Sequence, residues 1–465
     1  MRASGMKAAW IAGALVAGLG LRAAFLAQHP QFSGDALVYG ELAHNMLAHH
    51  MYVQTDPALH ATLIRMPGYP LFLALCFKLF GDANYLAVLW VQAGVDLATC
   101  GLIWTLARRV AGERAGWWAL WLSALCPFTA NYAAVALAET CSLFCVALAF
   151  FALERWIARR RMRWVVVIGF ALVWALFLRP DEGLLAAAVV PVMAWVGWRR
   201  SGEPMRKRFG PAVVAALFVV LPVMLWGVRN WRVFHVVQPL APRYANDPGE
   251  EVPYGFMRWY RTWAIGYPAT VNVYWMYDGS TVDVHDLPAR AFDDARQREE
   301  TMAAFAEYNR EQSSTPAVDA EFARLAEERV RAHPVEYYVL LPVARELDMW
   351  FRPRTALTRI PLDWWRVREH PWGSAEAMGL ALLNAAYLLL AAVGVVRWRR
   401  ARWNGQAALA WAMGAFVVLR CVLLLTIDNA EMRYTLECFP VVLVLCGVAA
   451  AEAKALETDG PKSAA

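Results

Sequence analysis

The sequence predicts an all-α protein that crosses a membrane about ten times. Hydrophobic residues make up 59% of the 465 residues and charged residues only 18%, and the mean hydropathy is +0.35. This composition is too apolar for a soluble chain of that length. A helix needs about 20 apolar residues to cross roughly 30 Å of hydrocarbon, and stretches of about that length recur along the whole chain.

The apolar stretches define the expected spans in order. The first lacks a small-residue cleavage site and is too long for a signal peptide, so we expect it to be a membrane anchor. The spans that we predict are Ala8–Ala27, Tyr85–Ala107, Ala115–Ala130, Ala133–Leu153, Arg163–Leu178, Gly183–Trp198, Gly210–Val228, Ala377–Val396, Ala407–Ile427 and Leu436–Ala451.

One further apolar stretch, Pro67–Phe80, is short for a span and better suited to an interfacial or re-entrant helix. Arginine placement supports that choice. If Pro67–Phe80 does not cross, the arginine-rich connections fall on the same side as Arg2 and Lys7, as the positive-inside rule requires. We therefore expect cytoplasmic N- and C-termini and an outer-face helix at Pro67–Phe80. The connections carry Arg108/Arg109/Arg114, Arg155/Arg159/Arg160/Arg161/Arg163, Arg199/Arg200/Arg206/Lys207/Arg208 and Arg397/Arg399/Arg400/Arg402.

Composition also excludes several functions. The net charge of +6 comes from cytoplasmic arginine facing anionic lipid, so we expect membrane lipids and no nucleic acid as partners. The eight cysteines lie in or near apolar spans and predict no disulfide framework. The nine histidines have no metal-ligand spacing, and no glycine-rich phosphate loop is present. We expect no metal and no cofactor. Alanine- and arginine-rich, lysine-poor usage suggests a bacterial cell (inner) membrane.

Two outer segments are substantial. The first, 28–84, contains a predicted surface helix in which Val38, Leu42 and Met46 recur at every fourth position. The second, 229–374, is predicted to be mainly helical over Asp293–Arg331 and to hold a small core. Its tryptophans favour the membrane interface. We therefore expect four parts: an N-terminal transmembrane module at 1–228, an extracytoplasmic or interfacial segment at 229–374, C-terminal transmembrane helices at 375–453 and a cytoplasmic tail at 454–465.

Asp35 is the principal candidate for catalysis. It follows the first span in the segment Gly34-Asp35-Ala36-Leu37-Val38-Tyr39. A carboxylate at this place could act as a general base that takes a proton from an acceptor hydroxyl. The alternative is an N-cap for the helix that follows, because Asp is favoured there. The two roles do not exclude each other.

The other outer-face candidates also have two interpretations. Glu139 stands at the outer start of a span, where an ionisable group favours function but could simply reach the lipid headgroups. Arg65, Arg179 and Arg433 suit a phosphate through planar, charge-assisted hydrogen bonds, or could contact lipid phosphates instead. Neighbouring polar side chains in the same segments complete the predicted substrate-binding set: Tyr39, Tyr69, Asp181 and Tyr434.

These segments, in this order and on one side of the membrane, resemble the GT-C membrane glycosyltransferases. The resemblance is to bacterial family 39, the protein O-mannosyltransferase-like enzymes, and to the aminoarabinose transferases. It covers the whole chain in layout. The segments that carry it are Gly34-Asp35-x-x-x-Tyr39, Arg65-x-Pro67-Gly68-x-Pro70, Ala138-Glu139, Val228-Arg229-Asn230-Trp231 and Arg433-Tyr434.

The resemblance implies an inverting hexosyl- or pentosyltransferase. It would move a sugar from a polyprenyl-phosphate donor to an acceptor hydroxyl or phosphate of a lipid, glycan or protein at the outer membrane face. Asp35 would be the base, Arg65 would bind the donor phosphate with Arg179 and Arg433 as further candidates, and Glu139 would line the cavity. The chain departs from the protein mannosyltransferases because Ala36, not Glu, follows Asp35, and because 229–374 shows no sugar-binding repeat.

A transporter or flippase is the alternative from another class. That function predicts ionisable residues near the bilayer midplane, and Asp96, about halfway along its span, fits this requirement. Arg420 lies off-centre in another span. A single buried Asp could instead bond a neighbouring helix. A membrane scaffold or sensor would leave the outer-face Asp, Glu and Arg residues unexplained.

Overall fold

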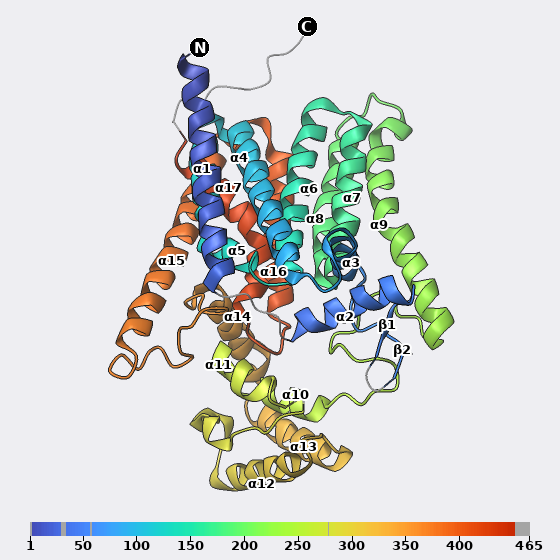
Figure 1. Cartoon of the computed structure of the whole chain (residues 1–465), viewed down its shortest axis with the longest axis vertical. Helices are drawn as coiled ribbons and strands as arrows, with labels where there is room; N and C mark the ends of the chain where they lie inside the picture. The colour runs from blue at the N-terminus through green and yellow to red at the C-terminus, as the bar shows by residue number, and fades with distance from the viewer. Residues whose placement is uncertain (1, 29–33, 56–57, 278, 452–465) are drawn as a thin grey trace. The chain divides into compact units, whose positions relative to one another are not determined.

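The computed structural model describes residues 2–28, 34–55, 58–277 and 279–451, with side chains from residue 8 onward (Figure 1). Part of the predicted first outer loop, 29–33, and the predicted tail, 454–465, lie outside the described residues. The chain forms two compact units. The first comprises Met1–Gly249, Ala386–Leu419 and Leu436–Ala465, and the second comprises Glu250–Ala385 and Arg420–Thr435.

The first unit is a helical bundle of membrane character. The prediction of an all-α polytopic membrane protein is confirmed, since eight helices among the described residues are long and apolar enough to cross a membrane. Two apolar helices, α3 and α7, are shorter. The elements of this unit are α1 (Arg2–Gln28), α2 (Asp35–Ala48), β1 (Val53–Gln54), β2 (His60–Ala61), α3 (Gly68–Phe80), α4 (Tyr85–Ala124), α5 (Pro127–Tyr132), α6 (Glu139–Arg159), α7 (Met162–Leu178), η1 (Pro180–Glu182), α8 (Gly183–Trp198), α9 (Met205–Phe234), η6 (Arg402–Gly405) and α17 (Phe439–Ala449).

Helix α4 contains the predicted span Tyr85–Ala107 and most of the next, Ala115–Ala130, which runs past the end of α4 into α5. Its backbone leaves the helical region at Ala111 and at Gly112, where φ is 87° and ψ is 179°. The ring centroids of Trp104 and Trp117 lie 6.0 Å apart. The chain therefore reverses its direction between these two residues. Gly112 permits this turn since a side chain is strained at positive φ. The predicted span Ala133–Leu153 begins too early, since its helix, α6, begins only at Glu139. Residues 133–138 are not helical, but their apolar sequence gives no sign of this.

The segment between α1 and α4 contains α2, a short antiparallel hairpin of β1 and β2, and α3. Helix α3 has 13 residues, about 20 Å at 1.5 Å per residue, which is shorter than the hydrocarbon layer. Its N-terminus touches the end of α7 so closely that a Cβ on Gly68 would lie 2.4 Å from the Phe177 carbonyl. Glycine is therefore required at the contact between these two helices.

The second unit is mainly helical, as predicted for the outer segment. Three of its elements, α15, α16 and η7, have residues in both units. The elements are α10 (Tyr254–Arg261), α11 (Tyr267–Ala269), η2 (Thr270–Tyr274), η3 (Val284–Asp286), η4 (Ala289–Ala291), α12 (Ala295–Glu311), α13 (Pro316–Ala332), η5 (Glu336–Leu340), α14 (Leu341–Phe351), α15 (Pro371–Arg400), α16 (Ala407–Leu424) and η7 (Met432–Cys438).

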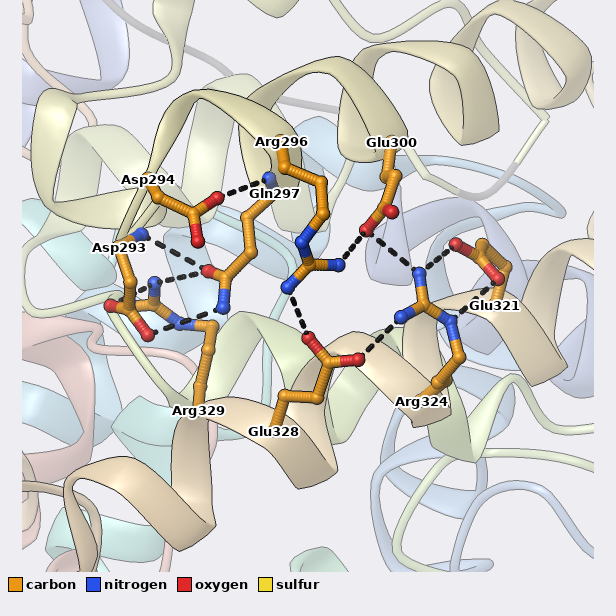
Figure 2. A network of polar contacts seen from close by, with 9 residues as sticks. All are labelled: Asp293, Asp294, Arg296, Gln297, Glu300, Glu321, Arg324, Glu328 and Arg329. Carbon is orange, nitrogen blue, oxygen red and sulfur yellow. Dashed lines mark hydrogen bonds and ion pairs between the residues drawn. The ribbon is translucent and has the colours of Figure 1, made fainter.

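This unit has an aromatic core of its own, in which Phe256 stacks on Tyr277 at 3.5 Å between ring centroids. Thr315 caps α13 and Pro316 occupies its first turn, so the predicted helical stretch divides into α12 and α13. Figure 2 shows the polar network that joins these two helices. Its buried end is Arg329, which bonds Asp293 at 2.7 Å and the Thr262 hydroxyl at 2.9 Å.

Candidate functional site

Asp35 lies at the start of α2 and pairs with Arg65. The N-cap position is Gly34, so Asp35 is the first helical residue and not the cap, although its charge still suits a helix N-terminus. The Asp35 Oδ1 atom accepts a hydrogen bond from Arg65 Nη2 at 2.6 Å. The side chains are 31% and 22% exposed, so the pair is open to a ligand and yet partly shielded from water.

A network of backbone contacts holds Arg65 in place. The Tyr52 hydroxyl donates to the Arg65 carbonyl at 3.0 Å. Arg229, at the end of α9, donates to the carbonyls of Tyr52 and Thr62, at 3.0 and 2.8 Å. Asp247 Oδ1 accepts from the Leu63 amide at 2.8 Å. Arg229 thus joins both sides of the β1–β2 hairpin that leads into Arg65. The segment that contains Arg229 carries part of the family resemblance, but this role was not predicted from the sequence.

Two tyrosine rings stand beside the pair. Tyr39 and Tyr69 make an edge-to-face contact at 5.0 Å, and the Arg65 guanidinium lies 6.0 Å from the Tyr39 ring centre. Burial, and then the charge of Asp35, raise the pKa of Tyr39 to about 12, so its hydroxyl stays protonated at neutral pH. The Tyr69 hydroxyl donates to Gln92 at 2.6 Å. The two tyrosines form a buried wall next to Asp35.

A second group gathers around Arg179, directly after α7. Its guanidinium lies 3.0 Å from Glu139, 3.3 Å from Glu437 and 3.2 Å from Asp181. Glu139 and Glu437 are both buried. The structure therefore brings together the predicted residues Glu139, Arg179 and Asp181. Glu437 was not among the predicted residues, because it stands at the boundary of a predicted span.

The two groups belong to one polar region of the first unit. Tyr39 links them, because the charges of Asp35, Arg65, Glu139 and Arg179 all act on its hydroxyl. Such an arrangement combines a carboxylate that can accept a proton with two guanidinium groups that suit a phosphate.

Arg433 and Tyr434 belong to the second unit. Both contact Glu431: Arg433 Nε lies 2.7 Å from Oε2, and the Tyr434 hydroxyl donates to Oε1 at 2.7 Å. Asn429 also donates to Oε1, at 3.0 Å. The two predicted residues thus share one carboxylate.

One group among the described residues has the composition of a metal site. Asp363, Glu369 and His370 have ligand atoms within 4.8 Å of one another. Arg366 lies among them, 3.7 Å from Asp363 and 3.3 Å from Glu369, and supplies positive charge to both carboxylates. This group lies in the second unit, apart in sequence from the predicted catalytic residues.

Asp96, the residue that favoured a transporter, has a partner within the membrane bundle. Arg22 of α1 donates to Asp96 from Nε at 2.8 Å and to the carbonyls of Gly18 and Ala124 at 2.7 and 2.8 Å. The side chains of Arg22 and Asp96 are 0% and 2% exposed. The pair joins α1 to both arms of α4, which accounts for a buried ionisable residue without a transport pathway.

The fold and these sites define a polytopic helical membrane protein with an aspartate–arginine pair at the start of α2. Residues 61–226 match the family model described as dolichyl-phosphate-mannose-protein mannosyltransferase. This match confirms the resemblance predicted from the sequence, and it includes Arg65, Glu139, Arg179 and Asp181. No curated protein sequence matches the chain at a significant level.

Solved structures also align with the chain. An oligosaccharyltransferase from Archaeoglobus fulgidus, in complex with Zn and sulfate, aligns with a TM-score of 0.49 and 11% identity over 95% of this chain and 48% of its own. ArnT from Cupriavidus metallidurans bound to undecaprenyl phosphate aligns with a TM-score of 0.40 and 17% identity over 96% of this chain and 78% of its own. The chain spans about half the length of the archaeal protein.

Proposed function

We propose that this protein is an inverting glycosyltransferase that uses a polyprenyl-phosphate-linked sugar at the outer face of the cytoplasmic membrane. The observation that carries the proposal is the partly exposed Asp35–Arg65 pair, with Arg65 inside the part of the chain that matches the mannosyltransferase family. A lipid-linked donor needs cations for its phosphate, and an acceptor hydroxyl needs a base. The pair supplies one of each.

The reaction follows from these roles. The acceptor oxygen attacks C1 of the sugar while the bond from C1 to the phosphate oxygen breaks. The acceptor proton passes to Asp35, and the leaving phosphate keeps the electron pair of the broken bond. Arg65 and Arg179 offset the negative charge that develops on this phosphate. Attack opposite to the leaving group inverts the configuration at C1.

The ion pair also sets the state of the base before the donor binds. Before the donor binds, Arg65 Nη2 donates to one oxygen of the Asp35 carboxylate. A donor phosphate competes for the same guanidinium, because Arg binds phosphate with two parallel hydrogen bonds. Once Arg65 turns to the phosphate, the Asp35 oxygen that it had bonded is available to accept the acceptor proton. Donor binding therefore prepares the residue that activates the acceptor.

The test is transfer by the purified full-length protein in vesicles with a panel of polyprenyl-phosphate sugars and lipid, glycan and peptide acceptors. We expect wild type to consume at least one donor, and Asp35→Asn to lower transfer by roughly 10²–10⁴-fold. Asp82→Asn is the matched control, because Asp82 is an exposed first-segment carboxylate that contacts His44. Transfer by Asp35→Asn at the wild-type rate would refute the role of Asp35.

A wild-type protein that consumes no donor from the panel would refute the proposed reaction. Flux of a labelled lipid-linked sugar across the same vesicles would then be measured, because a transporter is the alternative. The Asp96–Arg22 contact removes the residue that favoured that alternative.

A further inference from the structure

Helix α14 of the second unit has its polarity reversed relative to a helix in water. The helical turn η5 directly precedes it and exposes one charged residue, Glu336. Every exposed residue of α14 is apolar, whereas the charged Arg345 is buried and donates to the carbonyls of Arg261 and Ala264 at 3.2 and 3.0 Å. A helix at a water-facing surface shows the opposite pattern.

The exposed side chains recur at every fourth position. Each is between 43% and 65% exposed, which is a large fraction for aliphatic and aromatic side chains grouped along one segment. Tyr338 and Leu340 extend the same apolar surface at its N-terminal end. We name this surface the α14 stripe, and its members are Val335, Val339, Val343, Leu347 and Phe351.

Contacts within the second unit place the C-terminal end of the stripe beside membrane helices. Asn384, near the middle of α15, donates to the Trp350 carbonyl at 2.7 Å. Met349 packs in one cluster with Leu424, the last residue of α16. Both α15 and α16 are long and apolar enough to span a membrane. The end of α14 therefore lies at the depth of membrane-spanning segments.

Apolar side chains are also exposed on α15, which contacts the end of α14. Met378 and Leu382, which belong to the same unit, are exposed on α15 in the stretch just before Asn384. Helix α15 faces hydrocarbon along such a surface, because a spanning helix has no water to meet there.

We propose that the α14 stripe contacts the acyl chains of the lipid bilayer, with Phe351 deeper than Val335. The exposed face of α14 is apolar and its buried face holds Arg345, which is the arrangement expected of a helix in contact with an apolar solvent. Helix α14 thus attaches the second unit to the membrane beside α15 and α16.

The experiment measures collision rates of a nitroxide label with oxygen, which concentrates in hydrocarbon, and with a water-soluble nickel chelate. Labels are placed at Val335→Cys, Val343→Cys and Leu347→Cys in the full chain, in vesicles of phosphatidylethanolamine and phosphatidylglycerol. Seven of the eight native cysteines are buried and Cys421 is partly so, and labelled wild type gives their background. Ala303→Cys on α12 is the control, because Ala303 is exposed on a polar helix.

We expect the oxygen-to-nickel ratio to be severalfold higher at Val343→Cys and Leu347→Cys than at Ala303→Cys, and to rise from position 335 to position 347. Two results would overturn the proposal. A ratio equal to that at position 303 would place the stripe in water. Low rates with both reagents would show that protein covers the stripe, either this chain or a second copy. If one variant does not fold, the other stripe position reports on the same surface.

Discussion

Two ion pairs of the first unit differ in what surrounds them. The Arg22–Asp96 pair is enclosed, and its arginine also bonds two backbone carbonyls. The Arg65–Asp35 pair is partly open, and its arginine bonds one nearby carbonyl, that of Ile64, at 3.1 Å. A buried pair that loses one partner leaves a charge in a low dielectric, whereas an open pair can exchange its partner for water or a ligand. An arginine–aspartate pair thus stabilises the fold at Arg22–Asp96, whereas the pair at Arg65–Asp35 is open to take part in a reaction.

The largest effect on stability is expected from breaking the enclosed pair. Arg22→Met leaves Asp96 buried without its guanidinium and should lower the free energy of unfolding by about 3–5 kcal/mol. The double variant Arg22→Met/Asp96→Leu should recover most of the loss, because no charge then remains. Unfolding in detergent measures both, with Arg206→Met, at an exposed arginine, as the control. Equal stability of Arg22→Met and wild type would contradict the structural role.

Breaking the open pair should affect transfer and not folding. Arg65→Gln removes a cation from the proposed phosphate site and should lower transfer by roughly 10²–10³-fold. The free energy of unfolding should change by less than about 1 kcal/mol, because the pair is partly exposed. Arg258→Gln, at an exposed arginine of α10, is the control. A loss of stability as large as that of Arg22→Met would remove the distinction between the two pairs.

A smaller effect is expected where Arg229 supports the open pair from a distance. Arg229→Lys keeps the charge but cannot bond Tyr52 and Thr62 with the same planar group. Transfer should fall about tenfold, which corresponds to about 1.4 kcal/mol. Because Arg229 acts through the position of Arg65, the Michaelis constant for the donor should rise more than kcat falls. An unchanged Michaelis constant would show that the hairpin does not position Arg65.

The smallest effect concerns the exposed network between α12 and α13 (Figure 2). Hydrogen bonds from Arg324 and then Arg296 lower the pKa of Glu300 from its ordinary value of 4.5. Because the folded-state pKa is the lower one, the network stabilises the folded state above the unfolded-state pKa and loses this effect as pH falls through the folded-state pKa. Relative to the intrinsic exchange rate at each pH, the protection of α12 amides should therefore fall slightly at acidic pH.

The same exchange experiment on Glu300→Gln should show a weaker dependence on acidic pH than wild type. Glu299→Gln is the matched control, because Glu299 is an exposed neighbour on the same helix. Identical pH dependence in wild type and Glu300→Gln would assign the acid effect to another carboxylate.

The membrane architecture could be predicted from sequence because apolar length is a local property. The short α3 and the two arms of α4 followed from this property and from the positions of arginine. The ion pairs could not be predicted in the same way, because Arg22 and Asp96 are 74 positions apart. A signal existed nonetheless: an Asp in a span needs a partner, and Arg22 stands in another span.

The candidate site was predicted in part. Asp35, Arg65, Glu139 and Arg179 were each identified from residue type and sidedness, but their pairing required the fold. Glu437 was missed because it lies at the start of the predicted span Leu436–Ala451. The supporting role of Arg229 was missed because its bonds go to backbone carbonyls, which carry no sequence signal.

The contact at Gly68 has a consequence for the geometry of the two cations. Arg65 stands three residues before Gly68, and Arg179 stands two residues after Phe177, whose carbonyl touches Gly68. The absence of a single methyl group therefore fixes the spacing between the backbones that carry the two guanidinium groups. Side-chain rotation can adjust where each charge points, but the spacing of the backbones that carry them is a property of the α3–α7 junction.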